Sequence, residues 1–428
     1  MNVFKFSRLF FKGLRRNFKI IRYGDVPEVY KVKVHMDRYA FCDGSFKGLF
    51  MGMKELGRHL FRPLIKIYEI PETPVLYCGP TKNNEREFEF FSSYISREIS
   101  VLDYERGHNL SFVEAGELRK TRAEFALSCM VFLFCLVYMA RVRMGPMALK
   151  YLIVYSKVYL QVFSSFRRFR KWPRVMVVAN DHTDFPVATS MVMQLFRIPV
   201  VYVQHAEVSE SFPPLDFDVS ILRNERSLEV YRRVGMIAGD VFVLPRNAKA
   251  SNFERIFEMP SEKVPIVIYL SSIFNANEVE RCVTLLQSNP WATEVVLKPH
   301  PRGDLGSLRG LEGVSVAEST PDFYHVAVVP NSSVVVELLE NGIPVFQYFG
   351  LDDISRDYYR FVGDRIAPEV VESELSSQFW TTHFFDENWK VRFAAFSPSV
   401  DDSWQQQLPA FFSRMSEILS DTDKGGDF

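Results

Sequence analysis

The sequence has few cysteines and no metal-binding pattern among them. Its five cysteines are odd in number and scattered, so they form no CxxC pair and no cluster with histidine. This excludes a zinc ribbon or a disulfide framework and favours a reducing compartment. The formal net charge is only -1, so no nucleic-acid partner is expected from bulk charge, and any basic function must come from a local patch.

The sequence also lacks a secretion signal and a membrane-spanning run. The basic N-terminus has no uninterrupted apolar stretch followed by small residues for cleavage. The longest apolar run, residues 125–140, is shorter than the roughly 18–20 residues of a spanning helix. We expect this run to form a buried helix, with a helix that dips into the membrane as the alternative, and we expect a cytoplasmic protein.

Residues 1–22 carry charge of one sign only. They hold seven basic residues and no acidic one. On a helical wheel the basic residues fall within about 120°, and the large apolar residues lie opposite. A basic face beside an aromatic face is typical of a helix on an anionic membrane. We therefore predict a peripheral protein at the inner face of the plasma membrane; the alternative is a helix that packs on the protein through its phenylalanines.

The length of 428 residues suits two domains of about 200 residues each. Short apolar runs alternate with helical patterns in two series, which predicts two α/β units with parallel sheets. Neither unit contains a GxGxxG motif. Two Rossmann-like domains that face a cleft, the GT-B architecture, fit this pattern. The predicted parts are residues 1–22, 23–250, 251–390 and 391–428, the last being a helix and a disordered tail.

The apolar runs give the expected elements. The predicted strands are 74–78, 99–102, 175–179, 199–203, 219–222 and 241–244, then 265–270, 295–298, 314–317, 325–329 and 344–348. The predicted helices are 116–141, 147–169, 187–196, 278–287, 333–340 and 403–420. Ligands of doubly wound sheets bind beyond the C-terminal ends of the strands, so polar residues directly after a strand are candidates for the site.

Lys298, His300 and Arg302 follow one predicted strand of the second unit. Two prolines fix the backbone around the imidazole, and the two cations flank it. A rigid histidine between cations suits a phosphate or a departing nucleotide. The alternative is a basic turn whose histidine only caps the strand.

Ser332 and Ser333 lie between a predicted strand and a predicted helix. Their hydroxyls and the N–H groups of the helix start suit an anion, whereas the alternative is a plain N-cap. Glu337, one turn further, is placed either to hold a ribose hydroxyl or to serve the fold. Ser271 and Ser272, after the first strand of this unit, are weaker phosphate candidates.

Asp181, His182 and Asp184 follow a predicted strand of the first unit. Carboxylates and an imidazole at such a place can deprotonate an acceptor hydroxyl. The alternative is that Asp181 or Thr183 caps the next helix. His205 or Gln204, after the neighbouring strand, is expected to face the same cleft.

In their order, these segments resemble the bacterial polysialyltransferases and the sialic-acid or Kdo transferases of capsule and lipopolysaccharide synthesis. They resemble more distantly the CDP-glycerol glycerophosphotransferases of teichoic acid synthesis. Those families have a His-Pro motif and a downstream Ser-Ser motif near a cytidine nucleotide, which residues 300–301 and 332–333 match. Their acidic N-terminal element ends in glycine, and residues 180–182 depart from it. The resemblance covers roughly residues 174–350.

The resemblance implies a nucleotide-sugar-dependent glycosyltransferase. Residues 251–390 would bind the donor, either a CMP-activated sugar such as sialic acid or Kdo or a CDP-activated polyol. Residues 23–250 would bind the acceptor, a surface polysaccharide or glycolipid, and inversion or retention stays open. Positive side chains replace a metal at the leaving phosphate, so no metal or other cofactor is expected. The alternatives are an enzyme like UDP-GlcNAc 2-epimerase and a non-catalytic subunit of a polysaccharide assembly complex.

Overall fold

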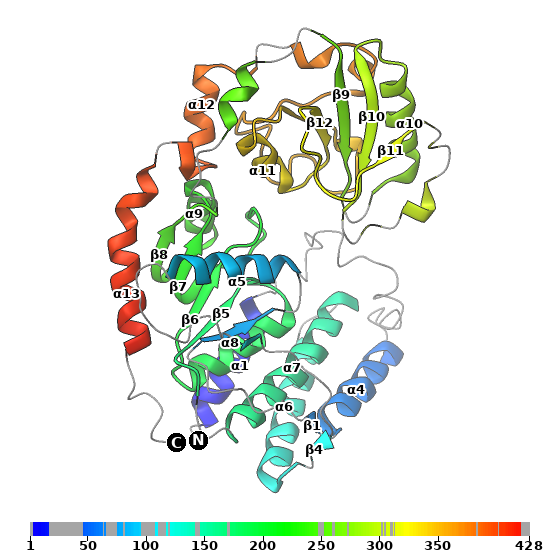
Figure 1. Cartoon of the computed structure of the whole chain (residues 1–428). Helices are drawn as coiled ribbons and strands as arrows, with labels where there is room; N and C mark the ends of the chain where they lie inside the picture. Colours follow the sequence, from blue (N-terminus) through cyan, green and yellow to red (C-terminus); the bar gives the residue numbers. More distant parts are fainter. Residues whose placement is uncertain are drawn as a thin grey trace.

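The computed structural model shows two α/β domains, drawn in Figure 1, as the alternating pattern predicted. Each is built on one parallel sheet with helices on both faces, so the GT-B architecture is confirmed by the topology of the chain. The structure describes residues 3–16, 46–62, 64–65, 75–79, 82–95, 108–109, 117–118, 120–141, 146–168, 172–246, 252–258, 262–271, 274–300, 303, 305–308, 311, 313–381, 384–400 and 402–420.

The N-terminal sheet has six strands in the order β3-β2-β5-β6-β7-β8, and every neighbouring pair is parallel. The predicted strand 99–102 lies outside the described residues. The inner strands are continuous apolar runs because helices cover both faces of the sheet. The strands are β2 (Val75–Cys78), β3 (His108–Asn109), β5 (Val175–Val178), β6 (Val200–Val203), β7 (Asp216–Leu222) and β8 (Ala238–Val243).

The helices divide between the two faces of this sheet, and each face has its own core. One face carries α1 (Val3–Arg16), α4 (Phe46–Phe61), α6 (Arg122–Arg141), α7 (Pro146–Phe166), α8 (Asp184–Leu195) and α9 (Glu225–Val234). The other carries α5 (Lys82–Ile95) and α13 (Leu408–Ser420), which returns from the end of the chain. The predicted helix 116–141 starts late, because Glu117–Leu118 (β4) pairs antiparallel with Leu64–Ile65 (β1).

The C-terminal sheet has five parallel strands in the order β11-β10-β9-β12-β13. These are β9 (Val264–Tyr269), β10 (Ala292–Lys298), β11 (Ser315–Val316), β12 (Val326–Val329) and β13 (Val345–Gln347). The helices are α10 (Ala276–Gln287), α11 (Val334–Glu340) and α12 (Glu387–Ala394). All five strands and the first two helices lie where the sequence predicted them.

The N-terminal helix forms as predicted, but its aromatic face does not meet a membrane. Phe6 and Phe10 are fully buried against α7. Tyr159 donates a hydrogen bond to the carbonyl of Phe6, and Tyr155 donates one to that of Phe10. The prediction that this face inserts into lipid is therefore wrong, and the alternative of a helix packed on the protein is correct. Tyr155 and Tyr159 of α7 are thus the partners of this face within the chain. A helical wheel shows that the face exists but not what it contacts.

The expectation of a buried helix over 125–140 is also only half correct. Among the described residues, α6 is the one helix long and apolar enough to cross a membrane, yet only 33% of its most apolar window is buried. One side of α6 packs through Leu127, Val131 and Cys135. The opposite side stays exposed.

Candidate active site

The C-terminal edges of the two sheets face each other where the domains touch. Arg223 follows β7 and Arg246 follows β8, and both bind Glu337 in the first turn of α11. Their nitrogens lie 3.5 and 2.9 Å from Oε1 of Glu337. The residues that follow β5, β6, β9, β10 and β12 stand at these same two edges.

Asp181 and His182 form a buried hydrogen-bonded pair after β5. Oδ1 of Asp181 lies 2.9 Å from Nδ1 of His182, and Oδ2 accepts a 2.8 Å bond from the hydroxyl of Tyr231. Asp181 is fully buried, whereas the side chain of His182 is 10% exposed. With both carboxylate oxygens engaged, Asp181 cannot itself reach an acceptor. The partly exposed imidazole is the group of this pair that can take a proton, and Asp181 orients it.

The carboxylate of Asp181 is ionised despite its burial. Burial alone would raise the pKa of Asp181, but the His182 ring, the Arg16 guanidinium and the Tyr231 hydroxyl outweigh it and lower the pKa. A carboxylate at Nδ1 favours the tautomer that carries its proton there, which leaves Nε2 as a proton acceptor.

The loop around this pair is fixed by its own polar groups. Oδ1 of Asn180 accepts hydrogen bonds from the backbone N–H groups of His182 and Thr183. Thr183 rather than Asp181 stands at the N-cap position of α8, but its side chain makes no capping bond. The capping alternative is therefore wrong for Asp181. Asp184 opens α8, where burial raises the pKa of its carboxyl and its Oδ1 accepts from the N–H of Phe185.

His205 stands beside His182, with the two ring centroids 6.3 Å apart. Burial and the neighbouring His182 lower the pKa of His205 to about 4, so its ring is neutral at pH 7. Gln204, in contrast, is fully buried. Its side-chain NH₂ group donates to the Ser227 hydroxyl and the carbonyl of Ala206, and its side-chain oxygen accepts from the backbone N–H of Arg223. A cleft role for Gln204 is therefore wrong, because its polar atoms join β6 to β7.

On the C-terminal domain, Lys298 ends β10, His300 follows it, and Ser271 follows the neighbouring strand β9. β10 lies beside β9, so these residues share one edge. Nζ of Lys298 donates to the carbonyl of Pro299 at 2.9 Å, and partial burial lowers the pKa of this lysine. Arg302 and Ser272, also predicted for the site, lie outside the described residues.

Ser332 and Ser333 follow β12, on the other side of β9. β10 and β12 are two strand spacings apart, which is about 10 Å. Ser333 stands at the N-cap position of α11, but its side chain makes no capping bond, so a plain cap does not account for it. Oγ of Ser332 accepts from the N–H of Val334 at 3.4 Å, at the start of the seven-residue α11. The anion site at the two hydroxyls stays a prediction.

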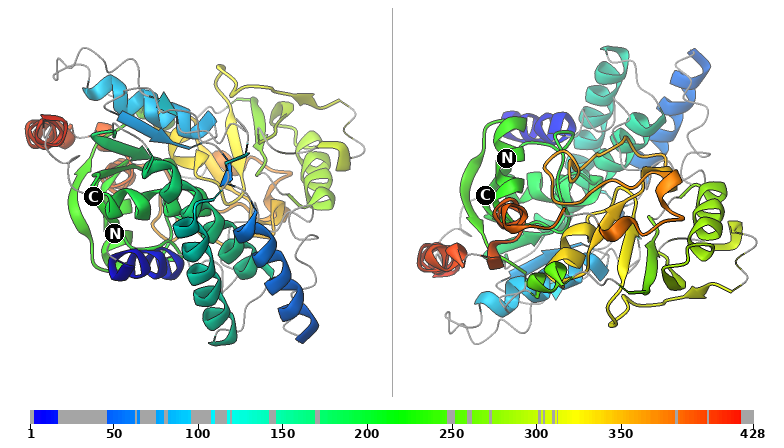
Figure 2. Two further views of the ribbon diagram at one scale, coloured as in Figure 1. Left: turned by 90° about the horizontal axis from the view of Figure 1, so that it is seen from below. Right: turned by 90° about the horizontal axis from the view of Figure 1, so that it is seen from above.

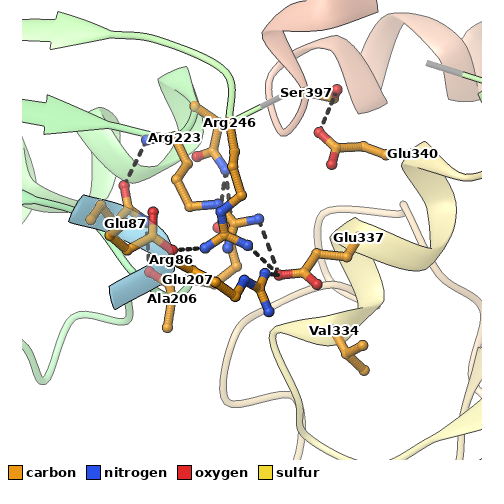
Figure 3. A network of polar contacts seen from close by, with 12 residues as sticks. Arg86, Glu87, Ala206, Glu207, Arg223, Arg246, Val334, Glu337, Glu340 and Ser397 are labelled. Atoms are coloured by element: carbon orange, nitrogen blue, oxygen red, sulfur yellow. Dashed lines mark hydrogen bonds and ion pairs between the residues drawn. The ribbon is translucent and has the colours of Figure 1, made fainter. Parts of the chain in front are cut away.

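Glu337 is engaged across the domain boundary, as Figure 3 shows. Arg86 of α5 adds a third guanidinium, 3.6 Å from the same Oε1. Burial alone would raise the pKa of Glu337, but the three arginines lower it. These ion pairs give Glu337 the structural role, the second of the two roles that the sequence left open beside binding a ribose hydroxyl. The interdomain cluster of Arg86, Arg223, Arg246 and Glu337 also includes the ion pair of Arg246 with Glu87.

The sequence reasoning missed the arginines of this cluster. Arg223 directly follows a correctly predicted strand, so the rule that identified His205 applies to it as well. Its Nη1 has no hydrogen-bond partner within the described part of the chain, although the residue is buried. Arg16 and Tyr231 gave no local signal, since they reach Asp181 from distant helices. Among the described residues, no group of three or more histidine, cysteine, aspartate or glutamate side chains is placed to hold a metal.

The comparisons with known proteins give no match in sequence: no family model matches the chain, and no curated protein matches it. Several solved structures share its two-domain arrangement at 9–12% identity. The calicheamicin glycosyltransferase CalG4 has a TM-score of 0.48 at 9% identity, over 83% of this chain and 100% of its own. A UDP-N-acetylglucosamine 2-epimerase from Rickettsia bellii has 0.44 at 12%, over 82% and 99%. MurG of Acinetobacter baumannii has 0.41 at 9%, over 81% and 100%. TM-scores below 0.5 leave the activity to be argued from this chain's own residues.

Proposed function

We propose that the protein is a glycosyltransferase that uses a nucleotide-activated donor. The observation that carries this is the buried Asp181 holding the partly exposed His182 at the edge of one sheet. The edge of the other sheet presents Lys298, His300 and Ser332. A base on one domain and anion-binding groups on the other are the two requirements of glycosyl transfer from a nucleotide.

The mechanism follows from these groups. Nε2 of His182 takes the proton of the acceptor hydroxyl as its oxygen bonds to the anomeric carbon of the donor sugar. The bond from that carbon to the phosphate oxygen breaks, and its electron pair leaves with the nucleotide. Lys298, His300, Ser332 and Ser333 stabilise the negative charge that develops there. Because Asp181 is enclosed and cannot act as a nucleophile, we propose a single displacement with inversion.

The resemblance of the His-Pro and Ser-Ser segments supports a cytidine nucleotide. We propose a CMP-activated sugar such as sialic acid or Kdo as donor. The alternative is a CDP-activated polyol: there the acceptor oxygen would bond to the β-phosphorus, and the bond from that phosphorus to the oxygen shared with the α-phosphate would break, releasing CMP. The acceptor would be a surface polysaccharide or a glycolipid of capsule or lipopolysaccharide synthesis, and the place of action the cytoplasmic face of the membrane. No metal or other cofactor is assigned a role.

Nucleotide release tests the proposal. The protein is incubated separately with CMP-sugars, CDP-glycerol and UDP-sugars, with and without a glycan acceptor. Acceptor-dependent release of CMP or of the cytidine nucleotide of CDP-glycerol is the expected result. Conversion of a UDP-sugar without an acceptor would identify an epimerase, and no turnover of any donor would favour a non-catalytic subunit.

A further inference from the structure

The outer side of α6 is an exposed apolar stripe. Phe125, Leu133 and Val137 are 52%, 59% and 50% exposed. No charged residue occurs from 125 to 140, while Arg122 and Arg141 stand at the two ends of the helix. Soluble surfaces rarely expose contiguous apolar patches of this kind without a partner.

The stripe continues onto α4. Phe50 and Phe61 of α4 are 57% and 39% exposed. The rings of Phe61 and Phe125 have centroids 5.5 Å apart, so the two helices share one apolar surface. The inner side of each helix is packed, since Leu56 and Leu60 of α4 are buried in the same core.

Most of the charged side chains described on these two helices are basic. Lys54 and Arg58 of α4 are exposed, and so is Arg62 directly after the helix. The only acids of α4 and α6 are already neutralised: Glu55 pairs with Arg58 and His59, and the buried Glu124 pairs with Arg168.

Basic residues are also frequent in the sequence from α6 onward. The chain as a whole is close to neutral, yet residues 125–180 contain nine lysines and arginines and no acid. In both views of Figure 2, α1, the α6–α7 pair and α4 lie along one side of the molecule, and α1 adds the exposed Arg8 and Arg15.

We propose that α4 and α6 form a docking surface for an anionic lipid bilayer, with Phe50, Phe61, Phe125, Leu133 and Val137 inserting between headgroups and Lys54, Arg58 and Arg62 meeting lipid phosphates. Aromatic and aliphatic side chains flanked by cations are the composition that binds a membrane interface. α6 lies on the bilayer rather than across it, because its other side belongs to the protein core. The biological reason for this docking surface rests on the proposed function, because a glycolipid acceptor would lie in the bilayer that the surface binds.

Vesicle binding tests the surface without donor or acceptor, so this proposal and the proposed function can fail separately. The full chain is sedimented with vesicles of phosphatidylcholine alone or with one-third phosphatidylglycerol. Wild type is expected to bind the anionic vesicles, and less at high salt. The double variant Leu133→Glu/Val137→Glu should lower the partition coefficient on the order of 10- to 100-fold. Lys54→Gln/Arg62→Gln should weaken binding to the anionic vesicles only.

Met236→Glu/Val391→Glu is the matched control, because these residues are 90% and 75% exposed and lie outside α4 and α6, the first between α9 and β8 and the second on α12. It should bind as wild type does. A second measurement avoids charged substitutions: brominated lipid should quench the fluorescence of Leu133→Trp more strongly than that of Met236→Trp.

Four results would overturn the proposal. If wild type does not bind anionic vesicles, or if the α6 double variant binds them as wild type does, α4 and α6 are not a lipid-binding surface. Equal quenching of the two tryptophans places the contact elsewhere. Self-association that the α6 variant abolishes, without vesicle binding, makes the stripe an interface between copies of the chain.

Discussion

Asp181 and His182 are neighbours in the chain, and their side chains turn toward each other, with Oδ1 of the first 2.9 Å from Nδ1 of the second. The two residues have different roles in taking the proton of the acceptor. The fully buried Asp181 holds the charge and the orientation, and the partly exposed His182 presents the nitrogen that can act. From the sequence either residue was a candidate for the base, and burial now separates their roles.

His182→Gln is expected to lower transfer by roughly 10²–10⁴-fold while donor binding survives, because the substitution removes the base and leaves the opposite domain intact. Asp181→Asn should lower transfer comparably, since an amide donor facing Nδ1 favours the wrong tautomer. Initial rates under saturating donor, with calorimetric donor binding beside them, measure both effects.

Asp184→Asn is the control for this pair, because Asp184 carries a nearby carboxyl at the start of α8, where its Oδ1 accepts from the N–H of Phe185. Its transfer rate should stay close to that of wild type. If His182→Gln keeps full activity and Asp184→Asn loses it, the base is Asp184.

Binding of the nucleotide depends on the C-terminal edge. A hydrogen bond to a charged group contributes about 1.5–3 kcal/mol, so His300→Ala or Ser333→Ala should each weaken nucleotide binding roughly 10- to 100-fold. Calorimetric titration of CMP, CDP and UDP measures this, with cytidine nucleotides preferred. Ser319→Ala, an exposed serine of the same domain, is the control. Millimolar affinity for all three nucleotides in every variant would remove the case for a nucleotide-sugar transferase.

The strands were predictable because burial on both faces of a parallel sheet requires apolar side chains at every position. Val175–Val178 and Val326–Val329 are short runs of apolar, mostly β-branched residues, and only a strand buried on both faces requires such a run. Positions directly after strands then pointed to Asp181, His182 and His205. The helix α9 was missed because its sequence, ERSLEVYRRV, is largely charged, and even Arg226 is buried in it.

Contacts between distant segments could not be predicted from the sequence. A helical wheel shows that α1 has an aromatic face, but it cannot distinguish lipid from the tyrosines of α7 as the partner of that face. The same limit applies to Glu337, whose three arginines come from separate elements of the other domain. The contacts of Glu337 depend on how the two domains pack against each other.

Glu337 is expected to couple the domains energetically. Removing its charge leaves the buried Arg223 without its main counter-charge, so Glu337→Gln should lower the free energy of unfolding by about 1–3 kcal/mol. A double-mutant cycle with Arg246→Gln should show a coupling of about 1 kcal/mol or more. Urea unfolding measures both quantities, and Glu318→Gln, an exposed glutamate of the same domain, should change little. A coupling near zero would show that the cluster contributes no stability.

Arg16 links the N-terminal helix to the site. Its Nε donates to the carbonyl of Asp181 at 3.0 Å, and its guanidinium lies 4.5 Å from the ring centroid of Phe217. Arg16→Met should therefore lower both the unfolding free energy, by about 1–3 kcal/mol, and the transfer rate. Arg15→Met removes the exposed neighbouring charge and is the matched control. Equal behaviour of the two variants in thermal unfolding and activity would contradict a role for α1 in positioning the loop.

His205 makes stability depend on pH in a defined window. Burial lowers its pKa to about 4 in the folded protein, whereas an unfolded histidine titrates near 6.5. Below about 6.5 the unfolded chain binds a proton that the folded chain does not, so this stabilisation is present above that pH and is lost as the pH falls toward 4. His205→Gln removes the effect, so the variant should lose roughly 1–2 kcal/mol less stability than wild type between pH 7.5 and pH 5. Urea unfolding at the two pH values measures the difference; the same loss in both proteins would mean that the His205 ring is protonated as easily in the folded chain as in the unfolded one.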